Sequence, residues 1–384
     1  MHAHELRDWL RLTASDGIGP GTARRLLAAL GPPPAILAAD PAAWQAVAGA
    51  ACAQALQQPP DGLDELLART LQWRDADADQ RAVVAIGDAG YPAALLQADD
   101  PPVLLYLQGT AEARAALARG GATGLAVVGS RNPTPQGLLN ARQFAQTVAG
   151  QGVTIVSGLA AGIDGAAHEG ALAGAEQCAQ RPHPLPTVAV VGTGLDRVYP
   201  KRHLDLARRI AQHGVILSEY PIGTPPLAPN FPRRNRLIAG LARATLVVEA
   251  ALPSGSLITA SMALEQGRDV LAIPGSIHSP QSRGCHALIK QGARLVDSVQ
   301  DVLDELGLHG SAVRPASSTG TPDAVRDDDA AALLEALGHD PVGLDALAAR
   351  SGLDAATLQA RLLELELDAQ VARLPGGLFQ RLHG

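Results

Sequence analysis

Between about Arg81 and Leu308, short runs rich in β-branched residues alternate with segments of helix length. This alternation constrains the fold more than any other feature of the chain. Strand–helix–strand repeats place successive strands parallel, and a parallel sheet must be covered by helices on both faces. We therefore predict an α/β domain with a parallel sheet over residues 81–308. Its predicted strands are Leu125–Gly129, Val153–Ser157, Thr187–Val191, Val215–Ser218, Ala244–Glu249 and Asp269–Ile273.

The segment before this domain has another pattern. Residues 1–75 read as short helices broken by Gly and Pro, and Asp16–Leu30 places a Gly-rich turn before an amphipathic helix. A helix-hairpin-helix turn of this kind can offer backbone N–H groups to a DNA phosphate. The same glycines serve equally well in a purely structural turn between helices, which is the interpretation we favour.

The segment after the domain divides into two parts. Small, polar and Pro-containing residues over 309–329 predict a linker. Residues 330–384 predict a winged-helix domain, with three helices followed by a Pro-Gly-Gly turn between two extended runs. A helix that reads the major groove should be basic, whereas the third helix carries Glu364 and Glu366, so we rank protein contact or oligomerisation above DNA reading. The three helices are Ala330–Leu337, Leu344–Ser351 and Ala355–Leu367.

Composition and charge exclude several classes of protein. The chain has 384 residues, of which 47% are hydrophobic, but its apolar runs are far shorter than the roughly 20 residues of a membrane span. The first ten residues, MHAHELRDWL, lack the apolar core of a signal peptide. Cys52, Cys178 and Cys285 form no CxxC pair, so we expect a cytoplasmic location and no zinc site. A net charge of −7 argues against a broad non-specific DNA coat, although local charge can still bind nucleic acid.

One short segment is strongly basic. Phe231–Ala242, FPRRNRLIAGLA, carries Arg233, Arg234 and Arg236 within four positions. Planar guanidinium forks suit phosphate oxygens, and the alternative is a solvated helix start with a few surface ion pairs. Three such side chains cannot all face the same way on a helix, so we expect at least one to serve structure or a dimer.

Glycine and serine follow nearly every predicted strand. Ligands of an open parallel sheet bind beyond the carboxyl ends of its strands, where glycine admits a close backbone approach and helix N-termini attract anions. Arg131 and Lys201 follow two of these strands and should converge with the arginine stretch. We therefore predict a DNA- or phosphate-binding surface at this edge. Its candidate residues are Gly129, Ser130, Arg131, Ser157, Gly158, Gly192, Gly194, Lys201, Phe231, Arg233, Arg234 and Asn235.

Cofactor motifs are incomplete. Gly192-Thr193-Gly194 offers GxG, but Arg197 stands where a dinucleotide motif needs its third glycine, and the motif follows the third strand rather than the first. No GxxxxGK[ST] loop for ATP is present. We therefore expect no nucleotide cofactor.

Catalytic interpretations are also weak. Asp164 and His168 share a helix face, but no GxSxG elbow accompanies them, so we expect a structural hydrogen bond. Glu219 and Glu249 could form a carboxylate pair for acid–base chemistry, yet strand-end glutamates more commonly hold loop amides or arginines. We expect no catalytic residue and no metal ligand. The structural residues of the pocket are then Asp164, His168, Glu249, Ser254 and Gly255.

Six segments taken together resemble the DNA-processing protein A (DprA/Smf) family and occur in its order. The flanking parts resemble, more loosely, a SAM-like N-terminal module and a winged-helix C-terminal module. The six segments are GSRNPTPQG (129–137), SGLAAGIDGAAHEGAL (157–172), VAVVGTGLDRVYPKRH (188–203), LSEYPIGTPP (217–226), FPRRNRLIAGLA (231–242) and SGSLITASMALEQGRDVLAIPG (254–275).

The resemblance implies a recombination mediator that needs no cofactor and performs no turnover. Such proteins bind single-stranded DNA through an extended Rossmann-like domain, dimerise, and load the RecA recombinase during natural transformation. By this resemblance, Arg131 and Lys201 contact phosphate, and the FPRRNR arginines and Asn235 line the same pocket. Ser256–Gln291 would contribute to the dimer and recombinase surfaces. The chain departs from the pattern at Gly174–Thr187, which is longer than the usual turn.

Two other functions remain as alternatives. A nucleoside-monophosphate-cleaving enzyme would need a loop like PGGxGTxxE, and the corresponding LPSGSLITASMALE lacks the paired glycines. A transcription regulator is disfavoured by the acidic third helix. Only Phe231, Tyr220 and Tyr199 are aromatic near the pocket, so contacts should be chiefly to phosphates and affinity should fall with salt.

Overall fold

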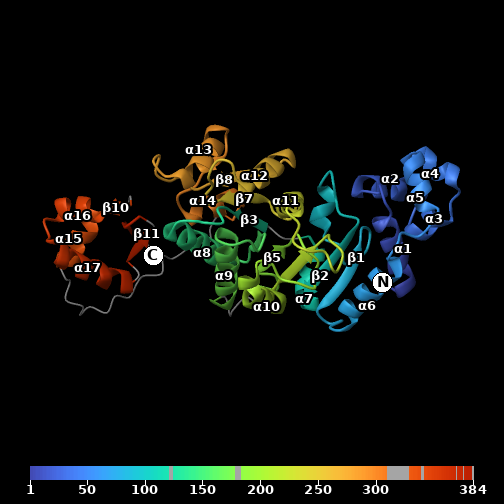
Figure 1. Ribbon diagram of the computed structural model, residues 1–384, viewed down its shortest axis with the longest axis horizontal. Coiled ribbons are helices and arrows are strands. Elements are labelled where there is room, and N and C mark those ends of the chain that lie inside the picture. The colour runs from blue at the N-terminus through green and yellow to red at the C-terminus, as the bar shows by residue number, and fades with distance from the viewer. Residues whose placement is uncertain are drawn as a thin grey trace.

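The computed structural model describes residues 1–120, 124–177, 183–308, 328–338, 341–368, 370–374 and 376–382. Figure 1 shows an N-terminal group of helices, a central α/β part and a small C-terminal part. No helix in these ranges combines the length and the apolarity that crossing a bilayer requires.

The N-terminal helices have two different packing partners. Leu6 and Leu10 on the first helix and Trp73 on the last share a core with strands of the central sheet, and the Trp73 ring lies edge-on to Tyr106. The helices between them pack around Leu26, within a core of their own. The first and last helices therefore fix the group to the sheet. The six helices are α1 (Ala3–Ala14), α2 (Pro20–Leu30), α3 (Pro33–Ala38), α4 (Pro41–Ala48), α5 (Ala50–Leu56) and α6 (Leu63–Asp75).

The central part is a nine-stranded sheet in the order β1-β2-β6-β5-β4-β3-β7-β8-β9. The strands are β1 (Arg81–Ala85), β2 (Leu104–Gly109), β3 (Gly124–Val128), β4 (Thr154–Ser157), β5 (Thr187–Val190), β6 (Val215–Ser218), β7 (Ala244–Val247), β8 (Asp269–Ala272) and β9 (Arg294–Leu295). The helices of this part are α7 (Ala111–Ala118), α8 (Pro135–Gly150), α9 (Ile163–Gln177), α10 (Leu204–His213), α11 (Asn230–Gly240), α12 (Gly255–Glu265), α13 (Arg283–Lys290) and α14 (Val299–Glu305), with short 3₁₀ turns η1 (Ala93–Gln97), η2 (Lys201–His203) and η3 (Pro280–Ser282).

All six predicted strands are confirmed, with ends that differ by one or two residues, and they run parallel as expected. The predicted parallel sheet is confirmed, and two strands that were not predicted, β1 and β2, extend it at one edge. β1 pairs with β2 and β2 pairs with β6, both antiparallel. These two strands lie outside the strand–helix repeat, so the alternation that predicted the others did not include them.

The strand order creates a topological switch point. From β3 the chain steps outward through β4 and β5 to β6, and then returns to the other side of β3 to form β7 and β8. The loops after β3 and β7 therefore leave two neighbouring strands in opposite directions and open a crevice at their carboxyl ends. Buried apolar side chains fill both faces of the sheet beneath this crevice.

The C-terminal part has the predicted three helices and a hairpin around its own apolar core. α16 and α17 have the predicted bounds, whereas the first helix begins two residues earlier. The additional strand β10 pairs with β12, which gives a three-stranded sheet. The linker was predicted for 309–329. Residues 309–327 lie outside the described ranges, and 328–329 belong to the first helix. The elements are α15 (Asp328–Leu337), α16 (Leu344–Ser351), α17 (Ala355–Leu367), β10 (Val342–Gly343), β11 (Val371–Leu374) and β12 (Leu378–Arg381).

The long segment Gly174–Thr187 is partly helical. Residues 174–177 form the end of α9, and β5 begins at Thr187. Residues 178–182 lie outside the described ranges. The extra length therefore begins as an extension of α9 at the amino edge of the sheet, at the end opposite the crevice.

Candidate functional site

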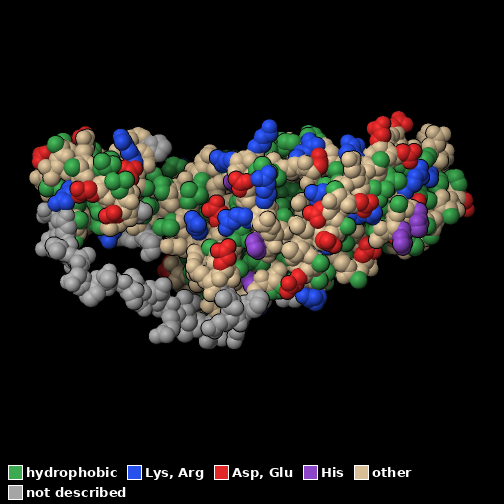
Figure 2. Space-filling model, turned by 90° about the horizontal axis from the view of Figure 1, so that it is seen from below, with side chains coloured by type: hydrophobic (Ala, Val, Ile, Leu, Met, Phe, Trp, Pro, Cys, Tyr) green, Lys and Arg blue, Asp and Glu red, His purple; other side chains and the backbone are tan. Residues whose placement is uncertain are grey.

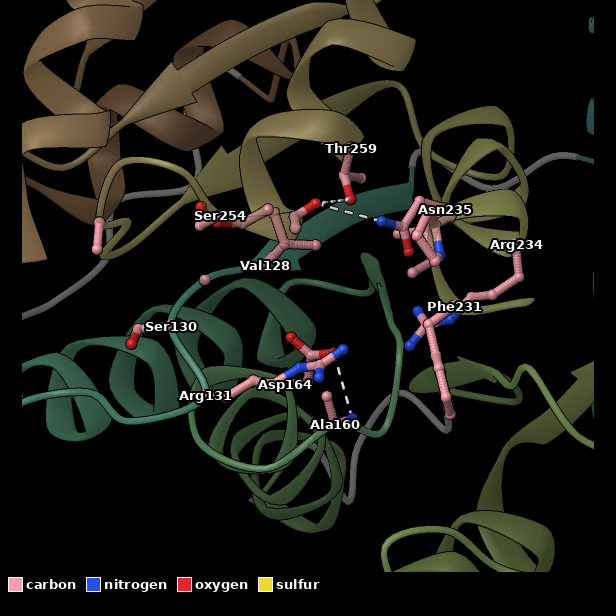
Figure 3. Close-up of a pocket in the computed structure, with 16 residues that line it drawn as sticks. Val128, Ser130, Arg131, Ala160, Asp164, Phe231, Arg234, Asn235, Ser254 and Thr259 are labelled. Carbon is pink, nitrogen blue, oxygen red and sulfur yellow. Dashed lines mark hydrogen bonds between the residues drawn. The ribbon is translucent and has the colours of Figure 1, made fainter. Parts of the chain in front are cut away.

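A cavity of about 340 Å³ opens at the switch point. The loops after β3, β4 and β7 and one face of α11 form its walls (Figure 3). Six of the candidate binding residues line it, and so do three of the residues assigned to structure. The six are Gly129, Ser130, Arg131, Phe231, Arg234 and Asn235, and the three are Asp164, Ser254 and Gly255.

Arg131 is the exposed cation of this cavity. Its guanidinium carbon lies 5.8 Å from the centroid of the Phe231 ring, in a cation–π contact. The Phe231 ring in turn lies 5.5 Å from the ring of Tyr199, which is 48% exposed. An exposed guanidinium and two neighbouring rings can hold a phosphate and offer faces to which a base can stack.

Lys201 does not line the cavity. It is exposed at the start of η2, two residues after Tyr199. The ring contact between Tyr199 and Phe231 therefore connects the Lys201 loop to the cavity mouth. The predicted convergence of Arg131 and Lys201 therefore stays a prediction, for a surface that would extend from the cavity across the two aromatic rings.

The loop after β4 is closed by the protein's own side chains. Arg234 is 4% exposed, and its Nη2 donates to the Gly158 carbonyl oxygen at 2.7 Å. Asp164 accepts from the Gly158 and Ala160 amides at 3.2 and 3.3 Å. A Cβ added to Gly158 would lie 1.8 Å from Nη1 of Arg234, so glycine is required here by an internal arginine.

The assignment of Ser157 to the binding surface is corrected by the structure. Ser157 is fully buried, and its hydroxyl donates to the Val127 carbonyl oxygen at 2.6 Å. Gly158 has both its amide and its carbonyl engaged within the protein. Neither residue has a group free for a ligand.

Burial shifts both charges beneath this loop. Burial raises the pKa of Asp164, while the nearby Arg234 guanidinium and the two amides oppose the shift. Burial also lowers the pKa of Arg234 to about 10, and Asp164 opposes that shift. Each group thus reduces the cost of burying the other.

The three arginines of α11 point in different directions, as expected for a helix. Arg233 is exposed, and Arg234 is buried behind the cavity. Arg236 pairs with Glu219 at 2.6 Å and with Asp100 at 3.0 Å. Two of the three therefore have internal partners, and the run that looked like one basic edge contains one unpaired cation within the described part of the chain.

Both strand-end glutamates hold loops or arginines, as expected. Glu249 accepts from the Thr134 amide at 2.9 Å and from the Thr134 hydroxyl at 2.6 Å. Thr134 also caps α8 by accepting from the Gly137 amide. Burial raises the pKa of Glu249, and these two bonds oppose it. Because Glu219 pairs with Arg236, the two carboxylates have separate partners and form no acid–base pair.

His168 and Asp164 lie on one face of α9, but they do not bond to each other. His168 Nδ1 lies 2.7 Å from the Thr187 hydroxyl oxygen. That hydroxyl donates its hydrogen to the Ile155 carbonyl oxygen, so it accepts from Nδ1–H and leaves Nε2 unprotonated. Each side chain instead has its own internal hydrogen-bond partners: Thr187 for His168, and the Gly158 and Ala160 amides for Asp164.

The glycines after β5 do not line the cavity. The Gly192 carbonyl oxygen accepts from Asn230 Nδ2 at 3.1 Å, and the Gly194 amide donates to the Thr224 carbonyl oxygen at 3.1 Å. Both glycines are buried, so the binding surface predicted there is occupied by internal contacts. Asn235, in contrast, does face the cavity and donates to the Gly255 carbonyl oxygen at 3.2 Å.

Sequence reasoning missed part of the cavity wall. Ala160, Ile238 and Thr259 line it; they lie within the six segments but are uncharged and were not named as site residues. Phe231, Asn235 and Ile238 follow one another at intervals of four and three residues, and residues spaced in this way share a helix face. This spacing could have predicted that Ile238 faces the cavity together with Phe231 and Asn235. In the described ranges, no group of three or more His, Cys, Asp or Glu side chains is placed to hold a metal ion.

Charge on the rest of the surface is mixed. On the face drawn in Figure 2, blue and red side chains are interspersed over the central part. A single basic coat is therefore not present on that face. Selective binding of an anion then depends on where an exposed cation stands at a cavity, as Arg131 does at the switch point.

An α/β sheet with an open, cation-bearing crevice at its switch point defines a class of phosphate-binding proteins. Comparison with known families identifies which one. Residues 82–307 match the family of DNA recombination-mediator protein A, and residues 315–377 match the DprA winged helix domain. The chain therefore belongs to the DNA recombination-mediator protein A family.

Individual relatives agree with this assignment. Protein Smf of Escherichia coli is 44% identical over 294 residues, which are 75% of this chain and 74% of that protein. The DNA processing protein DprA of Streptococcus pneumoniae is 46% identical over 221 residues, 58% of this chain and 73% of that protein. Membership of a mediator family agrees with the expectation that the chain is not an enzyme.

Two solved structures share the fold. The X-ray structure of DprA from Streptococcus pneumoniae has a TM-score of 0.64 at 36% identity, and covers 79% of this chain and 98% of its own. A structure of DNA processing protein A from Helicobacter pylori, titled for its single-stranded DNA binding mode, has a TM-score of 0.51 at 27% identity. It covers 60% of this chain and 96% of its own.

Proposed function

We propose that this chain binds single-stranded DNA at the switch-point cavity and passes it to a recombinase. The observation that carries the proposal is the exposed Arg131 guanidinium over the Phe231 ring, at the mouth of a cavity in the family's central domain. A guanidinium suits a phosphate, and the adjoining Phe231 and Tyr199 rings suit unpaired bases. Duplex DNA keeps its bases stacked inside and would not use these rings.

Titration of labelled oligo(dT) against each variant tests the proposal. Arg131→Ala or Lys201→Ala should weaken binding by roughly 1–3 kcal/mol, the range for loss of a charge-assisted hydrogen bond. Arg209→Ala is the matched control, because Arg209 is also exposed but lies on α10 and lines neither this cavity nor the one beside it. Unchanged affinity in both test variants would exclude the proposed surface.

Salt and strandedness provide a second test. If phosphate contacts dominate, the logarithm of affinity falls linearly with the logarithm of salt concentration, with a slope of about −0.7 per phosphate on single strands. Arg131→Ala should reduce the magnitude of that slope by about one contact. A duplex of the same length should bind more weakly than the single strand, and equal affinity would contradict the role of the rings.

The proposal includes a homodimer and RecA as the recombinase, which follow from the family resemblance. Exposed apolar side chains on α12 and in the loops before α12 and after β8 support an interface in this region. Ile277 is 76% exposed, Leu252 56% and Leu264 52%. Sedimentation of Ile277→Asp tests it: a shift from dimer to monomer is expected, and an unchanged dimer excludes this face.

A further inference from the structure

A second cavity, of about 620 Å³, lies between the N-terminal helices and the central domain. One wall is the end of α1 and the Gly-rich turn that leads into α2, from Thr13 to Ala23. The other wall comes from the loop after β6 with Tyr220, from the segment before β2 with Val103, and from Met262 on α12. This volume lies within the range of small-molecule sites.

Helix α11 stands between the two cavities. Phe231, Arg234 and Asn235 line the switch-point cavity, whereas Arg233 and Arg236 line the second one. A helix is about 10–12 Å across, including its side chains. A strand that lies in the first cavity therefore reaches the second by crossing the start of a single helix.

The charges of the second cavity are unequally matched. Arg236 pairs with both Glu219 and Asp100, and Asp100 also pairs with Arg24 of α2. These two arginines and two carboxylates compensate each other. Arg233 is exposed and has neither an ion pair nor a hydrogen bond among the described residues. Its charge reaches Glu219, but that carboxylate is already paired with Arg236, so Arg233 is the unpaired cation at this cavity.

The walls suit a nucleotide. Ile18, Tyr220 and Met262 provide an apolar surface for a ring, and the Tyr220 ring is fixed because its hydroxyl donates to the Asn230 carbonyl oxygen at 3.2 Å. Free lone pairs on the Glu219 and Asp100 carboxylates can accept from the amino groups of a base. The one free guanidinium matches one phosphate.

We propose that this second cavity is a nucleotide subsite for the same single strand that occupies the switch-point cavity, with Arg233 on the phosphate and the apolar wall against the base. The inference rests on the proposed function. It also gives the Gly-rich turn before α2, for which a structural role was favoured, a place beside the DNA. The N-terminal helices then take part in binding as one wall of the subsite.

Strand length separates this subsite from the first site. Oligo(dT) of about 4 and about 16 nucleotides covers the usual range of single-strand site sizes, and the longer strand should reach both cavities. Arg233→Ala should weaken the longer strand about tenfold and leave the shorter one unchanged, because only the longer strand contacts Arg233. Arg209→Ala, which removes the same charge from α10, should change neither.

The other outcomes overturn the inference in distinguishable ways. Equal weakening of both lengths by Arg233→Ala would place Arg233 in the first site, and no weakening of either would leave the second cavity without a phosphate contact. Failure of both lengths to bind the wild-type chain would remove the proposed function together with the subsite. If Arg131→Ala abolishes binding of both lengths while Arg233→Ala weakens neither, the first site is supported and the second is refuted.

Photo-crosslinking gives a readout that does not depend on a variant. Oligonucleotides with 4-thiothymidine are irradiated on the full-length chain, and the crosslinked peptides are identified by mass spectrometry. The longer strand should crosslink to the segment that contains Thr13–Ala23, and the shorter strand should not. Absence of that crosslink with the longer strand would refute the subsite even if Arg233→Ala weakens binding.

Discussion

The loops after β4 and β7 are similar in sequence, since both contain Gly and Ser. Their environments are opposite. After β4, Arg234 and Asp164 occupy the space at Gly158 and satisfy its backbone groups. After β7, no atom outside the chain neighbours lies within 4 Å of a Cβ added to Gly255, which lines the open cavity.

This difference shows that a glycine at a strand exit has two distinct explanations. It can admit a ligand, or it can admit the protein's own side chain. The same holds for arginine, because Arg233 and Arg234 are neighbours in sequence yet one is exposed and the other buried. The predictions below test whether the two exits differ in stability and in binding as their contacts indicate.

The largest expected effect on stability is at the exit of β4, where Arg234 and Asp164 fill the space beside Gly158. Arg234→Met removes the larger of the two favourable charges near the buried Asp164 and the donor to the Gly158 carbonyl oxygen, and loss of one partner of a buried charged pair costs about 3–5 kcal/mol of the free energy of unfolding. Urea denaturation followed by circular dichroism measures it. Arg233→Met is the matched control, with an expected change within about 0.5 kcal/mol because Arg233 is exposed. Equal losses in the two variants would mean that the contrast is wrong.

Gly158→Ala tests the same strand exit by changing the glycine instead of the arginine. The added methyl group overlaps the Arg234 guanidinium, and overpacking of this kind costs about 1–3 kcal/mol. The same urea experiment measures the loss. In an Arg234→Ala background the cost of Gly158→Ala should decrease, because the clashing group is gone. An undiminished cost would assign the strain to another contact.

The pH dependence of stability comes next in size. Burial first, and then the nearby His203 and Arg234, lower the pKa of His168 from 6.5 to about 3. As pH falls below about 6.5, the unfolded chain gains a proton at this residue that the folded protein does not, so stability falls with pH. The stabilising contribution is full above about pH 6.5 and is lost progressively down to about pH 3.

Urea midpoints at about pH 7.5 and about pH 5 measure this contribution. His168 should account for roughly 1–2 kcal/mol of the loss between them, because each pKa unit corresponds to 1.36 kcal/mol. His168→Gln removes the titrating group, so its stability should depend less steeply on pH than that of the wild type. Identical slopes would show that His168 titrates normally in the folded protein.

The smallest expected effect on stability is at the exit of β7, where Gly255 lines the open cavity. Gly255→Ala should leave the free energy of unfolding unchanged or raise it by at most about 1 kcal/mol, because the site has room and alanine restricts the unfolded chain. Binding of oligo(dT) to this variant should weaken if a phosphate approaches the backbone there. A stability loss as large as that of Gly158→Ala would remove the contrast between the two exits.

Much of the fold followed from local patterns. The six parallel strands and the helices of the C-terminal part were predicted nearly to the residue, because β-branched runs and helix-length spacing are properties of neighbouring residues. β1 and β2 were not predicted, because they lie outside the strand–helix repeat and join the sheet through the antiparallel pairing of β2 with β6, more than a hundred residues away. Packing of Leu6 and Leu10 against the sheet is long-range in the same way.

The site was predicted in outline rather than in detail. The edge of the sheet and Arg131 follow from topology and charge, and both are where they were expected. Which glycines face outward did not follow, because the sequence around Ser157 and Gly158 does not record that Arg234 fills the space beside them. The partner of an arginine is a tertiary property, so a basic run in the sequence overstates the positive charge available to a ligand.

Asp100 has a consequence for how the molecule can respond to partners. This one carboxylate pairs with Arg24 on α2 and with Arg236 on α11, and so connects the N-terminal helices to the helix between the two cavities. If DNA binding at α11 favours one arrangement of this connection, thermodynamic linkage requires that docking of a partner on the N-terminal helices change DNA affinity by the same factor that DNA changes partner affinity. If the favoured arrangement is the intact one, a protein that pulls Arg24 away from Asp100 would weaken DNA binding without touching the strand itself.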